Sequence, residues 1–573
     1  MKQWRINLIF IFFIIFWAAI IGRLLFIQVL NHQYWQALAQ GQQIVFESMV
    51  GDRGEIFLKD RKGVVPLAIN RVDSLCFASP QEIEREEELA ENLADILDLD
   101  KDVLLEKFQA KESLFVPIKH KLAEEEINKL KELNWPGIYL KEEKNRYYPQ
   151  ESLASQVVGF LSGDGEGHYG IEGYWQETIT GKESVVKGEK GPEGYLFLFN
   201  RQSYKPQKGS DLVLTIDYNI QYFAEMLLEK AKEELNIKGG QIVVADPNSG
   251  GIIALANLPG FNPNQYSSQA DLGVFQNGAV QKIFEPGSVF KPITIAAALD
   301  KGKITPQTIY IDEGKVAIGT YTIYNYDGRV WGEKTMTEVL DLSINTGAIF
   351  VERQLGHDNF LKYIEDFGFF EPTGIDLQGE IFSENKEFKK GYEVNFATAS
   401  FGQGIEITPI QLTRAFCAIA NGGELVNLHV VEKVIDPLPS FSLFEGDNGQ
   451  IDDLRSDRER ILSSKTTSQL TAMLVSGVED GYSKSAKVLG YFIAGKTGTA
   501  QVPWSSLGIQ KRGYSEQTWQ SFVGFAPAFN PQFVILVKLD DPEAKSAGYS
   551  AAPIFRDLAK YIIDYWQIPP DYE

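Results

Sequence analysis

The sequence predicts an α/β protein in which an N-terminal transmembrane helix and a smaller mixed region precede an antiparallel sheet covered by helices. Three observations predict it. Residues 6–21 form an almost unbroken apolar run, and acidic amphipathic helices follow within residues 81–135. From residue 211 on, strand-like segments at both ends flank a long helical middle. Such an order favours a sheet with helices packed on its faces.

The composition argues against several classes of function. The 573 residues correspond to about three to four domain-sized units. A formal net charge of −22 argues against sequence-independent nucleic-acid binding, which needs a basic face. Cys76 and Cys417 are too far apart for a disulfide framework or a cysteine zinc site, and the histidines are scattered without a HExxH motif. No metal is therefore expected, and a hydrolase or transferase that uses hydroxyl, amine and amide groups remains open.

The N-terminus predicts a membrane anchor over residues 1–30. Its apolar run over residues 6–21 is short for a spanning helix, but the apolar pattern continues beyond it. Lys2 and Arg5 precede the run, so the positive-inside rule predicts a cytoplasmic N-terminus and an extracytoplasmic remainder. The alternative is a signal peptide cleaved near Ala37-Leu38-Ala39. That triplet lies far beyond the run, which is itself long for a signal peptide.

The elements after the anchor fall into two regions. Residues 31–80 mix polar helix with short strands, residues 81–135 carry the acidic helices, and a polar stretch over residues 200–209 predicts a linker. Beyond it the pattern predicts a strand at 212–216, a helix at 220–235, strands at 241–246 and 251–257, late strands at 521–526 and 533–539, and a closing helix near 553–565. Cys417 lies in an apolar helical pattern and is expected to be a core thiol.

A serine and a lysine at helical spacing form the first candidate catalytic pair. Ser288 follows a Pro-Gly break and precedes an apolar helical pattern, and Lys291 lies on the same face of that helix. A lysine acts as a general base only when it is neutral, which requires burial and a second cation nearby. The spacing alone is a weak signal. Two other pairs satisfy it without a comparable break: Ser184 with Lys187, and Ser383 with Lys386.

Two further polar segments follow. Ser343 and Asn345 interrupt an apparent helix over residues 336–355, where such side chains compete with the backbone for hydrogen bonds, so a helix junction or a polar requirement is expected. Lys496, Thr497, Gly498 and Thr499 follow an apolar segment. They predict an edge strand that offers amides, hydroxyls and a cation to an anionic ligand, with the glycine allowing a close approach.

The order SxxK, SxN, KTG resembles the general signature of the penicillin-recognising serine enzymes. Further segments resemble class B penicillin-binding proteins and extend the similarity over residues 5–565. They lie at 53–56, 60–63, 146–149, 170–172, 214–217, 402–404, 421–423, 522–527 and 551–555. The resemblance implies an anchor over residues 1–30, an elongated α+β pedestal domain of the dimerisation type over 31–210, and a transpeptidase domain with a serine β-lactamase-like fold over 211–573.

The resemblance also implies a peptidoglycan D,D-transpeptidase that needs no cofactor. Ser288 would attack the penultimate D-Ala carbonyl of a D-Ala-D-Ala stem peptide, and Lys291 would take its proton. Ser343 would relay a proton to the leaving D-Ala, and Lys496 would keep Lys291 neutral. The amine of a neighbouring stem peptide would then accept the acyl group.

The remaining site residues are implied to bind the donor. Asn345 would hold the donor peptide backbone, and Thr497 and Thr499 would receive its terminal carboxylate beside Gly498. The amides of Ser288 and Thr499 would form the oxyanion hole, for which each donor contributes about 3–4 kcal/mol in other acyl-transfer enzymes.

The implied partners are β-lactam inhibitors, a membrane glycosyltransferase and divisome proteins. No nucleic acid is expected, and no glycosyltransferase activity, because residues 31–210 resemble the pedestal. The chain end at 568–571 and the segment 522–527 resemble the septal type more than the elongation type, which stays an alternative. A membrane-anchored β-lactamase or β-lactam sensor and a non-catalytic scaffold are further alternatives. The short tail argues against a sensor, and the intact motifs argue against a scaffold.

Overall fold

The computed structural model describes residues 3–26, 44–190, 196–198, 207–437 and 458–572. The chain forms two compact units. The first, residues 1–54 and 180–210, contains helix α1 (Gln3–Leu25) and an antiparallel sheet of order β1-β8-β9, with bounds Ile44–Val50, Glu183–Lys190 and Leu196–Leu198. Helix α1 is long and apolar enough to cross a membrane. The signal-peptide triplet at 37–39 and most of the linker at 200–209 lie outside the described residues.

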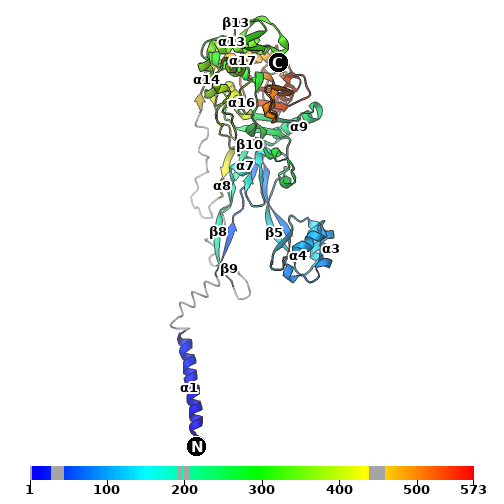
Figure 1. Cartoon of the computed structure of the whole chain (residues 1–573), viewed down its shortest axis with the longest axis vertical. Coiled ribbons are helices and arrows are strands. Elements are labelled where there is room, and N and C mark those ends of the chain that lie inside the picture. The colour runs from blue at the N-terminus through cyan, green and yellow to red at the C-terminus, as the bar shows by residue number, and fades with distance from the viewer. Residues whose placement is uncertain (1–2, 27–43, 191–195, 199–206, 438–457, 573) are drawn as a thin grey trace. The chain divides into compact units, whose positions relative to one another are not determined.

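The N-terminal part of the second unit is built on a six-stranded sheet. Its order is β18-β10-β2-β3-β4, and β5 pairs with β3 in a long antiparallel ribbon (Figure 1). The strands are β2 (Ile56–Asp60), β3 (Gly63–Ala78), β4 (Val116–Lys119), β5 (Ile138–Tyr147), β10 (Asp211–Asp217) and β18 (Val431–Ile435). Helices α3 (Glu86–Leu97), α4 (Lys101–Phe108) and α5 (Glu124–Leu133) enclose their own small core with this ribbon.

The predicted strand at 212–216 corresponds to β10, which pairs with β2 and β18. It is therefore not part of the five-stranded sheet that the later strands form. Its apolar residues predict a buried strand, and five consecutive positions of β10 are indeed buried. Burial on both faces is compatible with either sheet, so the pattern does not specify which neighbours it takes.

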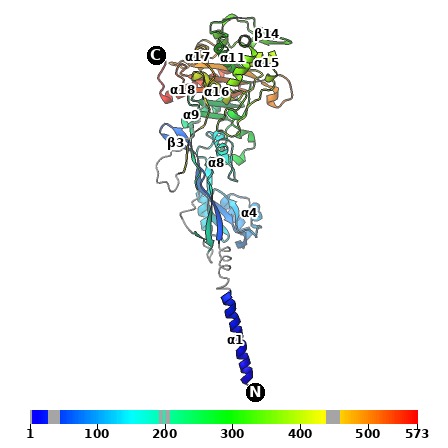
Figure 2. The ribbon, with the colours of Figure 1, turned by 90° about the vertical axis from the view of Figure 1, so that its left-hand side faces the viewer.

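The C-terminal part contains a five-stranded antiparallel sheet of order β12-β11-β22-β21-β20. Alternate residues of β22 enter two different cores: Ile535 packs with helices α9 and α18, and Leu536 packs with α11, α16 and α17. The helices therefore cover both faces of the sheet (Figures 1 and 2). The strands are β11 (Gly239–Ala245), β12 (Ile252–Leu258), β20 (Ala494–Pro503), β21 (Tyr514–Ala526) and β22 (Phe533–Asp540). The predicted fold class is confirmed.

The remaining helices and strands complete the second unit. The helices that pack on the faces of the sheet are α9 (Tyr218–Leu235), α11 (Lys291–Asp300), α16 (Pro409–Ala420), α17 (Ser464–Glu479) and α18 (Ala551–Trp566). Further helices are α6 (Ser155–Val158), α7 (Gly170–Tyr174), α8 (Gln176–Ile179), α10 (Gly278–Gln281), α12 (Met336–Asp341), α13 (Asn345–Leu355), α14 (His357–Asp366) and α15 (Glu393–Ala399). Small two-stranded sheets are formed by β6 (Phe160–Leu161) with β7 (Gly167–His168), β13 (Ile309–Asp312) with β16 (Gly332–Thr335), β14 (Lys315–Ile318) with β15 (Tyr321–Tyr324), and β17 (Glu424–Leu425) with β19 (Glu459–Arg460).

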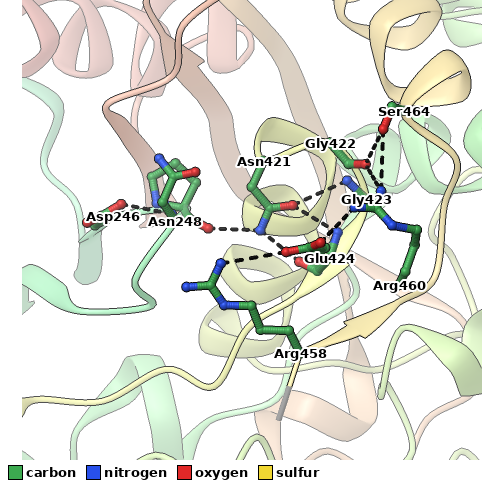
Figure 3. Close-up of polar contacts among 10 residues, drawn as sticks. Asp246, Asn248, Asn421, Gly422, Gly423, Glu424, Arg458, Arg460 and Ser464 are labelled. Atoms are coloured by element: carbon green, nitrogen blue, oxygen red, sulfur yellow. Dashed lines mark hydrogen bonds and ion pairs between the residues drawn. The ribbon is translucent and has the colours of Figure 1, made fainter. Parts of the chain in front are cut away.

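The loop after α16 contains residues 421–423, which form a hydrogen-bond network (Figure 3). Asn421 Nδ2 donates to the carbonyl oxygens of Pro247 (2.9 Å) and Glu424 (2.8 Å), while its Oδ1 accepts from the N–H groups of Gly423 and Glu424. Glu424 in turn pairs with Arg460 at 2.6 Å. Residues 421–423 therefore tie α16 to the turn before β12. Cys417 of α16 is fully buried, as predicted.

Candidate active site

Ser288 lies in the 3-10 helix η5 (Gly287–Phe290), directly before α11. Gly287 has φ +61° and its N–H donates to the carbonyl of Gly402 at 2.9 Å. A Cβ added at Gly402 would lie 2.1 Å from the Gly287 oxygen, so the two chains meet too closely for a side chain there. This contact fixes the half-buried Ser288 at the start of α11. Lys291, the first residue of α11, is fully buried, and its Nζ lies 3.1 Å from Ser288 Oγ.

The predicted interruption at Ser343 is confirmed as a helix junction. Helix α12 ends at Asp341, α13 begins at Asn345, and Ser343 between them has φ +54°. This turn presents three oxygen atoms to Lys291 Nζ: Ser343 O at 2.6 Å, Ser343 Oγ at 3.2 Å and Asn345 Oδ1 at 2.9 Å. The first two sequence motifs therefore meet at one amine.

The third motif lies on the edge strand β20, as predicted. Lys496 is buried, and its Nζ lies 3.0 Å from Ser343 Oγ and 3.1 Å from the carbonyl oxygen of Thr497. Thr499 Oγ1 accepts a hydrogen bond from the N–H of Ala547 at 3.1 Å. The close approach at Gly498 brings β20 against η5, because an added Cβ would lie 2.9 Å from Val289 Cγ1 and 3.0 Å from the Pro286 oxygen.

The two lysines have the electrostatics that a general base requires. Burial, and then the nearby Lys496, hold the pKa of Lys291 well below that of an ordinary lysine. Burial lowers the pKa of Lys496 to about 7, and the charge of Asp341 acts in the opposite direction. Because both amines lie within hydrogen-bond distance of Ser343 Oγ, protonation of both is disfavoured. The arrangement can therefore hold one neutral amine next to Ser288.

A buried polar network holds the start of α13, and sequence analysis did not predict it. Asn345 Nδ2 donates to the carbonyl oxygen of Tyr324 at 3.2 Å. Thr346 Oγ1 donates to Asp312 Oδ1 at 2.7 Å, and Asn325 Nδ2 lies 3.0 and 2.9 Å from the two oxygens of the same carboxylate. These residues are isolated polar positions in the sequence, and no spacing signal connects them.

Two buried carboxyl groups near the site were likewise not predicted. Glu285 accepts a hydrogen bond from Tyr514 OH at 2.9 Å, and burial raises its pKa to about 7. Asp341 is the last residue of α12. Within the described ranges, no cluster of histidine, cysteine and carboxylate side chains could hold a metal ion.

The other two SxxK pairs occur in different local structures. Ser383 Oγ donates to Glu406 Oε2 at 2.9 Å, while the Lys386 side chain is 81% exposed and pairs with Glu384. Ser184 and Lys187 lie on strand β8 instead of a helix. The Pro-Gly break before an apolar helix was therefore the signal that distinguished Ser288.

Comparison with known proteins identifies the family of the chain. The family model of the penicillin-binding protein transpeptidase domain matches residues 240–560, and that of the dimerisation domain matches residues 48–214. The chain is 31% identical to stage V sporulation protein D of Bacillus subtilis, over 97% of this chain and 85% of the relative. It is 30% identical to the probable peptidoglycan D,D-transpeptidase PbpC of Pseudomonas aeruginosa, over 100% of this chain and 96% of the relative.

A solved structure extends the likeness to the fold. Penicillin-binding protein 3 of Mycobacterium tuberculosis, in complex with aztreonam, superimposes with a TM-score of 0.69 at 25% identity, covering 91% of this chain and 98% of that one. Both family models match in the order that the resemblance implied. The chain belongs to the class B penicillin-binding proteins, with a dimerisation domain ahead of the transpeptidase domain.

Proposed function

We propose that this chain is a serine-type peptidoglycan D,D-transpeptidase in which Ser288 forms the acyl-enzyme. The observation that carries the proposal is the fully buried Lys291 amine, which lies between Ser288 Oγ (3.1 Å) and Ser343 Oγ (3.2 Å) beside a second buried lysine. A neutral amine in this position can accept the serine proton as the hydroxyl attacks a carbonyl.

The reaction proceeds in two acyl transfers. Ser288 Oγ bonds to the carbonyl carbon of the penultimate D-Ala while its proton passes to Lys291. The peptide bond then breaks, and the leaving D-Ala amine takes a proton through Ser343. In the second transfer the amine of a neighbouring stem peptide attacks the ester, loses its proton to the same base, and releases Ser288 with its proton restored.

Donor binding uses the remaining motif residues. Asn345 holds the donor backbone, and the hydroxyls of Thr497 and Thr499 receive the terminal carboxylate beside Lys496. The N–H groups of Ser288 and Thr499 bind the oxyanion, and Gly498 allows the contact between their two elements. β-Lactams acylate the same serine because they present a strained amide to the same groups.

The cellular setting follows the family. Helix α1 anchors the chain in the plasma membrane with the N-terminus in the cytoplasm, because Lys2 and Arg5 precede its apolar run. The chain works at the septum with a membrane glycosyltransferase and divisome proteins. Similarity to a relative named as a peptidoglycan D,D-transpeptidase FtsI homologue supports the septal type over the elongation type.

Fluorescent penicillin tests the catalytic assignment directly. The full-length protein in detergent is incubated with the probe and run on a denaturing gel beside Ser288→Ala and the surface control Ser383→Ala. We expect a band that persists for many minutes in the wild type and in Ser383→Ala and is lost in Ser288→Ala. A band that decays within seconds would favour a β-lactamase, and a folded wild type without any band would favour a scaffold.

A further inference from the structure

Asp341 is a buried carboxyl group that none of these steps uses. It lies at the end of α12 and is 9% exposed. Its Oδ2 accepts a hydrogen bond from Ser476 Oγ of α17 at 2.9 Å, while its Oδ1 is buried and has no hydrogen-bond partner in the part of the chain that the structure describes. A buried acceptor oxygen without a hydrogen-bond donor lowers the stability of the folded state. We therefore expect this carboxylate to make a compensating interaction.

Close packing fixes this carboxylate between α12, α17 and β20. The carbonyl of Asp341 accepts from the N–H of Tyr482 at 3.0 Å, and a Cβ added at Gly481 would lie 2.6 Å from that carbonyl oxygen. A Cβ added at Gly477 would lie 3.6 Å from Asp341 Oδ1 and 3.9 Å from the oxygen of Gly495. A side chain at position 477 of α17 would therefore meet both the Asp341 carboxylate and the backbone of the residue before Lys496.

One cation and two anions act on the Asp341 carboxylate. Lys496 on β20 is the cation that acts on it, while Asp480 after α17 and Glu338 one turn earlier on α12 are the anions. Lys496 itself contacts neutral oxygens of Ser343 and Thr497 and forms no ion pair within the described ranges. Burial raises the pKa of Asp341 to about 6, so the group is an anion at neutral pH, and this charge raises the pKa of Lys496.

We propose that Asp341 is a positioning residue for acyl transfer: its carboxylate keeps the proton on Lys496, and the charged Lys496 keeps Lys291 neutral. The inference rests on the proposed function. Two amines share Ser343 Oγ, and the Asp341 carboxylate raises the pKa of Lys496, while burial and then the charge of Lys496 lower the pKa of Lys291. Without that carboxylate, Lys496 would lose its proton at a lower pH.

The test is the pH profile of the second-order rate constant for acylation by fluorescent penicillin, measured on the full-length protein in detergent. On the alkaline limb of this profile, acylation slows because Lys496 loses its proton. In Asp341→Asn we expect this limb to move about one pH unit lower. The shift corresponds to about a tenfold slower acylation at pH 8. Below pH 6 the wild-type carboxyl is itself protonated, so the two profiles should converge there. Asp341→Glu, which keeps the charge, should restore part of the alkaline limb.

A control separates a charge effect from a structural one. Asp480→Asn removes a neighbouring exposed charge and keeps Asp341 with its hydrogen bond to Ser476, so it should leave the alkaline limb within a few tenths of a pH unit. An Asp341→Asn profile lowered by one factor at every pH would overturn the proposal. If Asp341→Asn does not fold, Asp341→Ser carries the same test. Loss of the proposed function itself would instead appear as labelling that survives in Ser288→Ala.

Discussion

Ser343 combines backbone strain with two contacts to the Lys291 amine. A left-handed conformation at a residue other than glycine costs about 1–2 kcal/mol, and Ser343 adopts it at φ +54°. In return its carbonyl oxygen and its hydroxyl both reach Lys291 Nζ, and the hydroxyl also reaches Lys496. Sequence reasoning predicted a polar interruption here because serine and asparagine are poor helix-interior residues. It did not predict that the backbone carbonyl would bind the Lys291 amine.

Gly498 gives a prediction at the same scale. In Gly498→Ala the new Cβ would lie 2.6 Å from Ser521 Oγ and 2.9 Å from Val289 Cγ1, so β20 must move away from η5. Overpacking of this kind costs about 1–3 kcal/mol. We expect acylation by fluorescent penicillin to slow at least about tenfold, because the shift separates Lys496 and Thr499 from Ser288. Gly260→Ala, whose Cβ would meet its nearest neighbour at 3.7 Å, should acylate at the wild-type rate.

At the scale of elements, local patterns predicted most of what positions the site. The Pro-Gly break predicted the start of α11, the polar pair predicted the junction between α12 and α13, and an apolar segment before KTG predicted the edge strand β20. These are local signals of capping, propensity and periodicity. The Asp312–Asn325–Thr346 network could not be predicted, since its members come from separate elements and meet only after folding.

That network yields a prediction about the attachment of the β13–β16 hairpins to α13. Thr346→Val keeps the shape of the side chain and removes its hydrogen bonds to Asp312 and Asn325, at 2.7 and 3.0 Å. Leaving a buried carboxylate without one donor costs about 1–3 kcal/mol. We expect a Tm lowered by about 2 °C or more, with slower acylation because Asn345 is held by the neighbouring Tyr324 carbonyl.

The matched control is Thr413→Val in α16. Thr413 is also buried, and within the described ranges its hydroxyl bonds only to the carbonyl of Pro409 one turn earlier in the same helix. Its loss should leave acylation unchanged. Equal acylation rates for Thr346→Val and Thr413→Val would contradict a positioning role for the network.

At the scale of the whole molecule, fold class and family were predictable and strand partners were not. The motif order specified the family because it joins residues far apart in the chain, and the match of both domain models confirms it. Strand β10 shows the opposite case, since its apolar pattern fits either sheet and only tertiary pairing with β2 and β18 selects one. The domain boundaries at residues 30 and 210 stay predictions.

Membrane topology is the remaining prediction at this scale, and the buried cysteines make it measurable. Cys76 and Cys417 are both fully buried, so an introduced cysteine supplies the reactive thiol in the native protein. Lys2 and Arg5 hold the N-terminus in the cytoplasm, so the probe there is Gln3→Cys, which keeps both charges. A membrane-impermeant maleimide applied to spheroplasts should label Leu114→Cys, where Leu114 is 65% exposed, and leave Gln3→Cys unlabelled. Permeabilised membranes should label both variants. Labelling of Gln3→Cys in sealed spheroplasts would reverse the orientation, and with it the extracytoplasmic setting that the proposed function requires.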